Sequence, residues 1–542
     1  MSVLTLPLLP DTNPQCGLQT PDLLLVTKGA PESVIKACDK ATVPAGHQAR
    51  LSDMAAQGYR VLACATKVLR GIDATRASHL QQAALETGMA FAGFLVMGNQ
   101  VKAQTGAVLQ AVTRAGVRQC MITGDNVLTA VAVARDSAES NMWQSGAGGE
   151  AWLMEVNVAI TGAAISELYE EHLTRCQGTA SALVLLLKHT HVYARAAPRE
   201  KQLIVRCLQG LGHVVCMVGD GANDSFALKS ADAGLSIAGH ERDPSESAAE
   251  DTLAVPSIAA PFSTPIAHIG AVPLLLREGR CALATSLVSF RYMFQYGVTQ
   301  FMATSLLYVH LSTLSAWQFL IADLVNTLPL VMVLNLTASA DHLQAGLPFT
   351  KLGSWRFVGA LAGNCAIICL GQVLQFLALR AQSFYDPLSA KEGSQGDPSQ
   401  EDTMLFLSST FMYLTQAIAL CHNYGGFRAN ATTNKPLVAI VLVLFTFNSA
   451  LFLVPTAAAQ SWLQMVDTIP WWFLFASWLW ALACGAALVA FEHFCVVKRE
   501  GFWFERQRQQ TAGGKLLSLH MPFTKQATIS ATAGSSPRYT LV

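Results

Sequence analysis

The stretch "VVCMVGDGANDSFALKSADAGLSI", Val214–Ile237, holds the pattern that decides the fold of the first half of the chain. An apolar run ends at a turn that contains Asp220, Asn223 and Asp224, and a run of small, helix-forming residues follows. Such a run before a glycine-rich turn is typical of a buried strand in a parallel sheet. Because carboxylates are the ligands that Mg²⁺ prefers, together with waters and a substrate phosphate, the turn predicts a metal site with these three residues as candidate ligands. The alternative is an Asp-rich turn without a ligand.

The composition separates the chain into a soluble and a membrane half. The 542 residues carry no net charge, and charged residues make up 13 %, about half the usual share. This low charge favours membrane spans, and the neutral balance gives no reason to expect nucleic-acid binding. The 13 cysteines lack metal-binding spacing, so we interpret them as reduced and structural. The first residues lack the basic region of a signal peptide.

The half that follows Pro273 alternates long apolar runs with polar loops. Each run can cross a hydrocarbon core of about 30 Å. The expected spans are residues 286–309, 316–337, 356–379, 404–422, 437–457 and 471–495. Lys351, Arg428 and Lys435 gather in the loops on one side, together with the basic residues of the tail. By the positive-inside rule, the soluble half and the tail face the cytoplasm and the helices lie in the lipid bilayer.

The soluble half alternates strand-like and helix-like segments, which indicates an α/β domain with a mostly parallel sheet. In "CMITGDNVLTAVAVARD", a strand ends at Ile122 and a helix follows the turn. Thr123, Gly124 and Asp125 can hold a phosphate oxygen at the helix N-terminus, or Thr123 or Asp125 can simply cap that helix. Lys201 in "APREKQLIVRCLQ" can neutralise a phosphoryl group or lie solvated on an amphipathic helix.

These three motifs, in this order, resemble the haloacid dehalogenase-like core, and their wording is closer still to the P-type ATPases. "WQFLIADLV" and "EDTMLFLSSTFMYLTQAIAL" resemble the fifth, polyamine-transporting class of that family. The resemblance covers about residues 22–495. It implies catalytic roles for Thr123, Gly124, Asp125 and Lys201, with ATP and Mg²⁺ as cofactors.

The segments "TKGAPE", Thr27–Glu32, and "GYRVLACATK", Gly58–Lys67, resemble the nucleotide-binding domain of the same family. The resemblance implies that Lys28 and Gly29 line an adenine pocket and that Arg60 reaches the nucleotide. It also implies four regions: a partial nucleotide-binding domain (1–90), a haloacid dehalogenase-like phosphorylation domain (91–272), a six-helix membrane domain (273–497) and a cytoplasmic tail (498–542), whose end is typical of a disordered segment. The expected location is an endomembrane compartment, either endolysosomal or vacuolar.

The family's DKTGT motif, which supplies the phosphorylated Asp, does not occur in the sequence. The nearest string, "CDKATVP", places Asp39 after a helix rather than a strand, so we do not interpret Asp39 as a nucleophile. We therefore expect the carboxy-terminal half of a pump that cannot autophosphorylate alone, whose partner is the missing amino-terminal half or an intact paralogue. Without the nucleophile strand, the neighbouring strands are expected to have unpaired edges. The alternative is a non-catalytic nucleotide-binding membrane protein that regulates or assembles with such a paralogue.

The second expected span carries the candidate transport path: Gln318, Asp323 and Asn326. An Asp inside an apolar span is costly unless it is paired or hydrated, so Asp323 is a functional candidate by default. Its alternative role is packing against a neighbouring helix. The family resemblance implies a polyamine as substrate, and an inorganic cation remains open.

Overall fold

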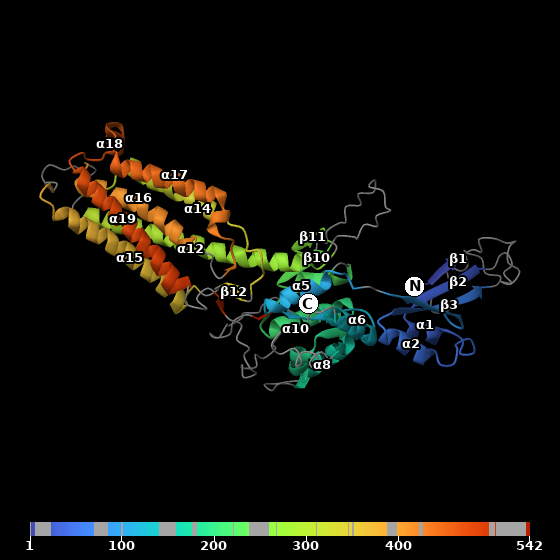
Figure 1. Ribbon diagram of the computed structural model, residues 1–542. Coiled ribbons are helices and arrows are strands. Elements are labelled where there is room, and N and C mark those ends of the chain that lie inside the picture. Colours follow the sequence, from blue (N-terminus) through green and yellow to red (C-terminus); the bar gives the residue numbers. More distant parts are fainter. Residues whose placement is uncertain are drawn as a thin grey trace. The chain divides into compact units, whose positions relative to one another are not determined.

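The computed structural model describes residues 2–5, 23–69, 85–98, 101–139, 159–175, 182–219, 222–237, 260–266, 268–309, 312–344, 346–348, 352–386, 398–421, 426–497, 504–505 and 538–541. The chain forms two compact units (Figure 1). The first comprises Met1–Thr113, Val117–Ala271 and Ala512–Val542, and the second comprises Arg114–Gly116 and Val272–Thr511.

The first unit begins with an antiparallel sheet in the order β1 (Ser2–Thr5), β2 (Leu23–Gly29), β3 (Arg60–Leu69) and β4 (Ala90–Met97). Its helices are α1 (Pro31–Ala37) and α2 (His47–Ala56). Along β2, buried and partly exposed residues alternate, as expected for a strand with one face on a core. Leu23 and Leu25 of β2 pack with Ala63 and Ala65 of β3 in that core. All pairings in this sheet are antiparallel, whereas the sequence predicts a mostly parallel sheet for the soluble half.

The rest of the first unit is an α/β domain with parallel strands. Its strands are β5 (Arg118–Gln119), β6 (Met121–Ile122), β7 (Ala159–Thr161), β8 (Val192–Ala194), β9 (His213–Gly219), β10 (Ala233–Ile237), β11 (Phe262–Thr264) and β14 (Arg538–Leu541). Its helices are α5 (Thr105–Arg114), α6 (Val127–Glu139), α8 (Gly162–Arg175), α9 (Ala182–His189), α10 (Pro198–Gly210) and α11 (Ser225–Ser230).

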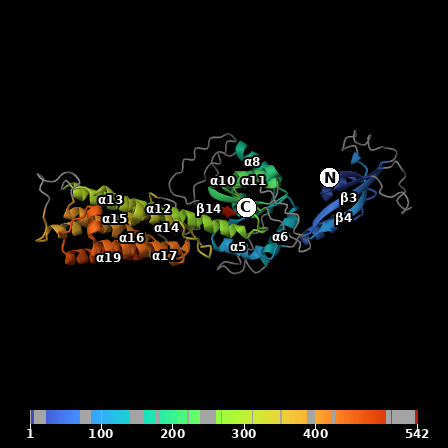
Figure 2. The same cartoon turned by 90° about the horizontal axis from the view of Figure 1, so that it is seen from above.

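These strands form two ladders, in the orders β11-β10-β9-β14-β5 and β6-β8-β7, and every pairing within them is parallel. Only Cys120 separates β5 from β6, so the two ladders are joined through one extended segment. Figure 2 shows α10 and α11 on one side of β14 and α5 on the other. The predicted α/β domain with a mostly parallel sheet is confirmed for this part of the chain.

The centre of this sheet corrects two expectations about the tail and the missing strand. β14, from the very end of the chain, pairs in parallel with β9 on one side and β5 on the other. Its last four residues before Val542 are therefore a strand rather than disordered, and they supply partners to the edges that were expected to be unpaired. Tyr539, Thr540 and Leu541 are residue types that favour extended structure, which is consistent with this role.

The second unit is a helical bundle. Its helices are α12 (Ala271–Tyr308), α13 (Ala316–Leu320), the π-helix Ile321–Thr327, α14 (Leu328–Leu334), α15 (Trp355–Arg380), α16 (Gln400–Leu420), α17 (Lys435–Leu453), α18 (Ala457–Leu463), α19 (Trp471–Phe491) and the π-helix Glu492–Val497. A short antiparallel pair, β12 (Leu347–Pro348) and β13 (Phe504–Glu505), belongs to the same unit. α16 is buried along almost its whole length, and Figure 1 shows it inside the bundle.

Within the residues that the structure describes, five segments are long and apolar enough to cross a membrane. They are Ala316–Leu334, Phe357–Arg380, Gln400–Leu420, Lys435–Leu453 and Trp471–Phe494. They coincide with the second to sixth expected spans. All but the last residue of the first expected span, 286–309, lie in α12, but this span is not among the five because it carries several polar side chains, such as Arg291, Gln295 and Thr299. A crossing by α12 stays a prediction.

Candidate functional site

The turn that follows β6 is fixed at the carboxyl edge of the sheet by its backbone. The Thr123 N–H donates to the carbonyl of Tyr193 at 2.8 Å, and the Ala196 N–H donates to the carbonyl of Thr123 at 3.0 Å. The Arg195 N–H donates to the carbonyl of Asp125 at 2.9 Å. Since β6 and β8 are parallel, these bonds place the turn beside the segment that leads into α10. Side chains that follow parallel strands meet at this edge, where α/β folds bind ligands.

The side chains of this turn bind each other instead of capping α6. The Thr123 hydroxyl donates to Asp125 Oδ2 at 3.0 Å and accepts from the Asp125 N–H at 3.1 Å. Asn126 Oδ1 accepts from the Leu128 N–H at 3.0 Å at the start of α6. The cap is therefore Asn126, and the interpretation of Thr123 or Asp125 as the cap is wrong. Gly124 has open space where a side chain would be.

Lys201 reaches the turn after β9. Its ammonium lies 2.6 Å from Asp224 Oδ1, and both side chains are only 12 % exposed. The Lys is placed in the first turn of α10, where Pro198 begins the helix and Glu200 accepts a hydrogen bond from the Ala197 N–H at 2.7 Å. Lys201 is thus not a solvated lysine on a helix surface. It provides a positive charge beside a buried carboxylate at the carboxyl edge of the sheet.

The turn after β9 has room for Asp224 only because residue 219 is glycine. A Cβ on Gly219 would lie 2.7 Å from Asp224 Oδ2 and 2.9 Å from Asp224 Cβ, which is too close for any side chain. Asn223, in the short helix before α11, is exposed. Asp220 lies outside the described residues.

These contacts fit a small cation with a phosphate. Asp224 is buried and already bound to an ammonium, and Mg²⁺ needs only one or two carboxylates when substrate phosphate and water complete its shell. Within the described residues, no group of three or more His, Cys, Asp and Glu gathers as a metal site. Asp224 and Asn223 are therefore the ligand candidates that the structure places.

The predicted nucleotide residues do not converge. Lys28 and Gly29, at the end of β2, lie opposite Cys64 and Ala63 of β3. Arg60 is four residues from Cys64 along the same strand, roughly 13 Å at the rise of a β-strand. The Arg60 side chain, 55 % exposed, instead lies 3.4 Å from Asp125 Oδ1. The structure therefore brings Arg60 to the turn after β6, and away from Lys28.

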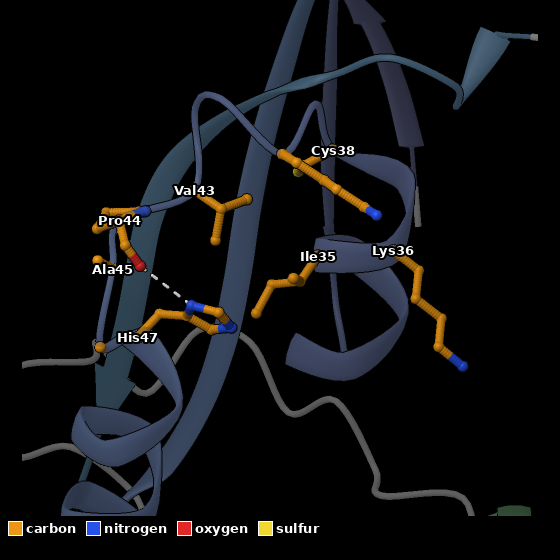
Figure 3. Close-up of a pocket in the computed structure, with 9 residues that line it drawn as sticks. Ile35, Lys36, Cys38, Val43, Pro44, Ala45 and His47 are labelled. Carbon is orange, nitrogen blue, oxygen red and sulfur yellow. Dashed lines mark hydrogen bonds between the residues drawn. The ribbon is translucent and has the colours of Figure 1, made fainter.

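A pocket of about 500 Å³ lies between α1 and the start of α2, in the part of the first unit that contains β2 and β3 (Figure 3). Ile35, Cys38, Val43 and His47 line it, and His47 Nδ1 lies 3.0 Å from the Pro44 carbonyl. Lys28, Gly29 and Arg60 are not part of its lining. The pocket does not unite the predicted nucleotide residues.

In the second unit, the three predicted transport residues point to three different neighbours. Asp323 lies in the π-helix Ile321–Thr327, is exposed, and accepts a hydrogen bond from the Tyr296 hydroxyl of α12. Asn326 is buried and accepts from Asn448 Nδ2 of α17 at 2.8 Å. π-Helical turns in transmembrane helices are frequent at functional sites.

Gln318, also buried, donates from Nε2 to Asp402 Oδ2 of α16 at 2.9 Å and to the Leu463 carbonyl at 3.1 Å. The sequence does not single out Tyr296 or Asp402 as functional residues. Tyr296 follows Gln295 in the first span, and a carboxyl-to-tyrosine pair across two helices has no local pattern. The apolar pattern predicts that the fourth span begins at residue 404, which places Asp402 outside it. In the structure, α16 begins at Gln400 and includes Asp402.

Two family models match the soluble part of the chain. Residues 70–232 match the haloacid dehalogenase-like hydrolases, and residues 12–104 match the P-type ATPase cytoplasmic domain N. Among curated proteins, the chain is 31 % identical over 497 residues to polyamine-transporting ATPase 13A3 of Mus musculus, which covers 81 % of this chain and 40 % of that protein. It is 33 % identical over 462 residues to polyamine-transporting ATPase 13A2 of Homo sapiens, with 79 % and 38 % covered.

A third relative is the vacuolar cation-transporting ATPase YPK9 of Saccharomyces cerevisiae, 30 % identical over 442 residues, with 73 % of this chain and 28 % of that protein covered. The chain thus spans about 40 % of the length of the mouse relative and less of the yeast one.

Proposed function

The chain is a relative of the P-type ATPases and carries their cytoplasmic domain N and haloacid dehalogenase-like domain, and we propose that it is the carboxy-terminal portion of an ATP-driven cation transporter. Its substrate in this proposal is a polyamine. The relatives named polyamine-transporting ATPases support that choice, and the carboxylates within the helical bundle supply the negative charge that an organic cation needs.

The observation that carries the proposal is the pair Lys201–Asp224 at the carboxyl edge of the parallel sheet. A buried ammonium at 2.6 Å from a buried carboxylate, beside a glycine that leaves no room for a Cβ, is suited to a phosphoryl group and its cation. The hydroxyl of Thr123 belongs to the same edge of the sheet. The described part of the same chain also contains five segments able to cross a membrane, as a transporter requires.

ATP and Mg²⁺ are the cofactors of this proposal. Mg²⁺ would neutralise phosphate charge and orient the transferred group. Asp224, with Asp220 and Asn223, would hold the ion, Lys201 would bind the phosphoryl group, and Thr123 would donate a hydrogen bond to a phosphate oxygen. Arg60, whose side chain lies 3.4 Å from Asp125 Oδ1, would reach the nucleotide phosphates rather than the adenine.

The test is nucleotide binding by the full chain in lipid nanodiscs. We expect Mg·ATP to raise the unfolding temperature of the chain, and Arg60→Ala and Asp224→Asn to reduce that increase. The matched control is Asp232→Asn, because the Asp232 carboxylate accepts from the Val215 N–H at the opposite end of β9 and should not contact nucleotide. If Mg·ATP has no effect on the parent chain, or the same effect on all variants, the proposed site is wrong.

Phosphorylation separates the proposal from a non-catalytic regulator. With γ-labelled ATP, we propose that this chain by itself takes up no acid-stable, hydroxylamine-sensitive label, because its sequence contains no DKTGT motif. Label on the purified chain would contradict that part of the proposal. Label that appears only when an amino-terminal half with DKTGT is co-expressed would support a pump made of two chains. A mixture that takes up no label but still binds Mg·ATP would favour a non-catalytic regulator.

Location follows from the same proposal. A vacuolar relative supports an endomembrane, endolysosomal or vacuolar compartment, with the nucleotide site on the cytoplasmic side. Fluorescence microscopy of the tagged chain with organelle markers tests this. A plasma-membrane signal alone would contradict it.

A further inference from the structure

Two carboxylates are buried at the start of α16, and neither has an ion-pair partner among the described residues. Glu401 and Asp402 are each only 2 % exposed. Glu401 Oε1 accepts from the Tyr385 hydroxyl, and Asp402 Oδ2 accepts from Gln318 Nε2 at 2.9 Å. Their second oxygens, Glu401 Oε2 and Asp402 Oδ1, are buried and have no hydrogen-bond partner among the described residues.

The local structure does not offset the cost of these charges. The Ser399 hydroxyl accepts from the Asp402 N–H at 3.0 Å, and both acids lie in the first turn of α16. The helix N-terminus stabilises a carboxylate only modestly, even when the carboxylate is partly buried. The desolvation of a buried ion costs more than this gain. Within the described part of the chain, neither acid forms an ion pair, so either protonation of the acids or a bound positive charge offsets this cost.

We propose that Glu401, Asp402 and Gln318 form a binding site for a primary ammonium group of an organic polycation. An ammonium brings one positive charge and three N–H donors. The free oxygens, Glu401 Oε2 and Asp402 Oδ1, are the acceptors available to such donors, and Gln318 Nε2 holds the other oxygen of Asp402 in place. The neighbouring Tyr385 ring already accepts a cation, because the Arg380 guanidinium lies 5.9 Å from its centroid.

The position of this site defines its place in transport. Gln318 begins its span, Asp402 begins another, and the Leu463 carbonyl of α18 completes the contacts of Gln318. All three therefore lie at the same end of the bundle, opposite the loops that carry Lys351 and Lys435. By the positive-inside rule, that end is the non-cytoplasmic one, so the site would load or release the polycation on the far side of the membrane. It is separate from exposed Asp323.

This inference rests on the proposed polyamine transport and deepens it. The experiment uses the full chain in lipid nanodiscs and measures the unfolding temperature with spermidine, and the affinity with labelled spermidine. We expect Asp402→Asn and Glu401→Gln each to weaken spermidine binding by about tenfold or more, the loss of one charge contact. Both substitutions conserve shape, so the Gln318 and Tyr385 contacts can persist in the folded chain.

The matched control is Asp467→Asn, because Asp467 lies between α18 and α19 at the same end of the bundle but is exposed. We expect it to bind spermidine like the parent. Equal weakening in all three variants would identify a general surface-charge effect and overturn the site. Equal stabilisation by K⁺ at matched ionic strength would assign an inorganic cation and overturn the ammonium assignment.

The failure of the inference differs from the failure of the proposed function. If the parent binds spermidine and the Asp402 and Glu401 variants bind it equally, the site is wrong and polyamine transport still stands. If the parent binds Mg·ATP but no spermidine, the polyamine substrate itself is wrong and this site falls with it.

Discussion

Arg291 of α12 and Glu492, at the start of the last π-helix, form an ion pair that is completely buried in the bundle. Two parallel hydrogen bonds join them, at 2.6 and 2.8 Å, and Asn364 donates a third to Glu492 at 3.1 Å. The three residues come from three helical segments. A bidentate, hydrogen-bonded pair is the geometry in which a buried charge is best tolerated.

We predict that breaking this pair is more harmful than removing it. Arg291→Met or Glu492→Met alone leaves one buried charge unpaired and should lower the free energy of unfolding by about 3–5 kcal/mol. The double variant should recover most of that loss. Unfolding of the chain in nanodiscs measures both. Arg277→Met is the control, because the Arg277–Glu278 pair at 3.8 Å on the same helix is only partly buried and should contribute about 0–1 kcal/mol. This variant also removes one hydrogen bond, from Arg277 to the Asp341 carbonyl at 3.1 Å.

A double variant that is no more stable than either single variant would contradict this prediction. It would show that the pair itself stabilises the bundle, beyond neutralising two buried charges.

Two cysteines, Cys207 of α10 and Cys216 of β9, should make the stability of the first unit depend on pH in the alkaline range. Burial raises the pKa of the Cys207 thiol from 9.0 to about 12 and that of Cys216 to about 11. Because the folded chain holds these protons more tightly than the unfolded chain, this contribution to stability is full below pH 9. It is lost as the pH rises from about 9 to 11 for Cys216 and to about 12 for Cys207, at about 1.4 kcal/mol per pKa unit.

We therefore expect the free energy of unfolding to fall with pH in this range, and Cys207→Ala to show a shallower slope although it loses some packing. Denaturant unfolding at several pH values measures the slope. An unchanged slope in the variant would show that Cys207 does not ionise on unfolding.

At the scale of the element, β14 is the strand on which the central sheet depends. Arg538–Leu541 pair with His213–Cys216 of β9, and Thr540 and Leu541 pair with Arg118 and Gln119 of β5. Deleting residues 538–542 would leave both neighbours with unpaired backbone groups. Each lost hydrogen bond costs about 0.5–1.5 kcal/mol, and exposed edges promote aggregation.

We predict that this deletion lowers the unfolding temperature of the first unit and increases aggregation. Thr540→Pro should have the same direction of effect, because proline cannot donate to a ladder, while Thr540→Ser keeps the backbone donor and is the control. Light scattering during thermal unfolding measures both properties. A deleted chain as stable and soluble as the parent would show that β14 is dispensable for the sheet.

The elements of this protein differ in how far their sequence predicts them. β9 and α10 are predictable because apolar periodicity and a glycine-rich turn are local signals. β14 is not, because its partners lie more than 300 residues earlier in the chain and a short polar tail carries no sign of them. For the same reason the motifs predict that Lys201 and Asp224 matter, but not that they bind each other.

The membrane helices show the same limit. Their apolar length is visible in the sequence, and the five segments lie close to the predicted ranges. The π-helix around Asp323 and the early start of α16 depend on tertiary packing, so the partners of Gln318 and Asp323 could not be predicted.

At the scale of the whole molecule, the two units have separate hydrophobic cores. Buried side chains of β2 and β3, and of α10 and β9, belong to clusters within the first unit. Those of α16 and its neighbours form other clusters within the second. Units with their own cores unfold as separate cooperative steps unless a large apolar interface joins them.

We predict two unfolding transitions for the full chain in nanodiscs. Mg·ATP should shift only the transition of the first unit, and a change in bilayer thickness should shift only that of the second, since hydrophobic mismatch acts on the spans. Calorimetry resolves the transitions. Tryptophan fluorescence assigns them, because eight of the ten tryptophans lie at position 317 or beyond. A single transition that moves with both Mg·ATP and bilayer thickness would mean that the units are energetically coupled before any phosphate is transferred.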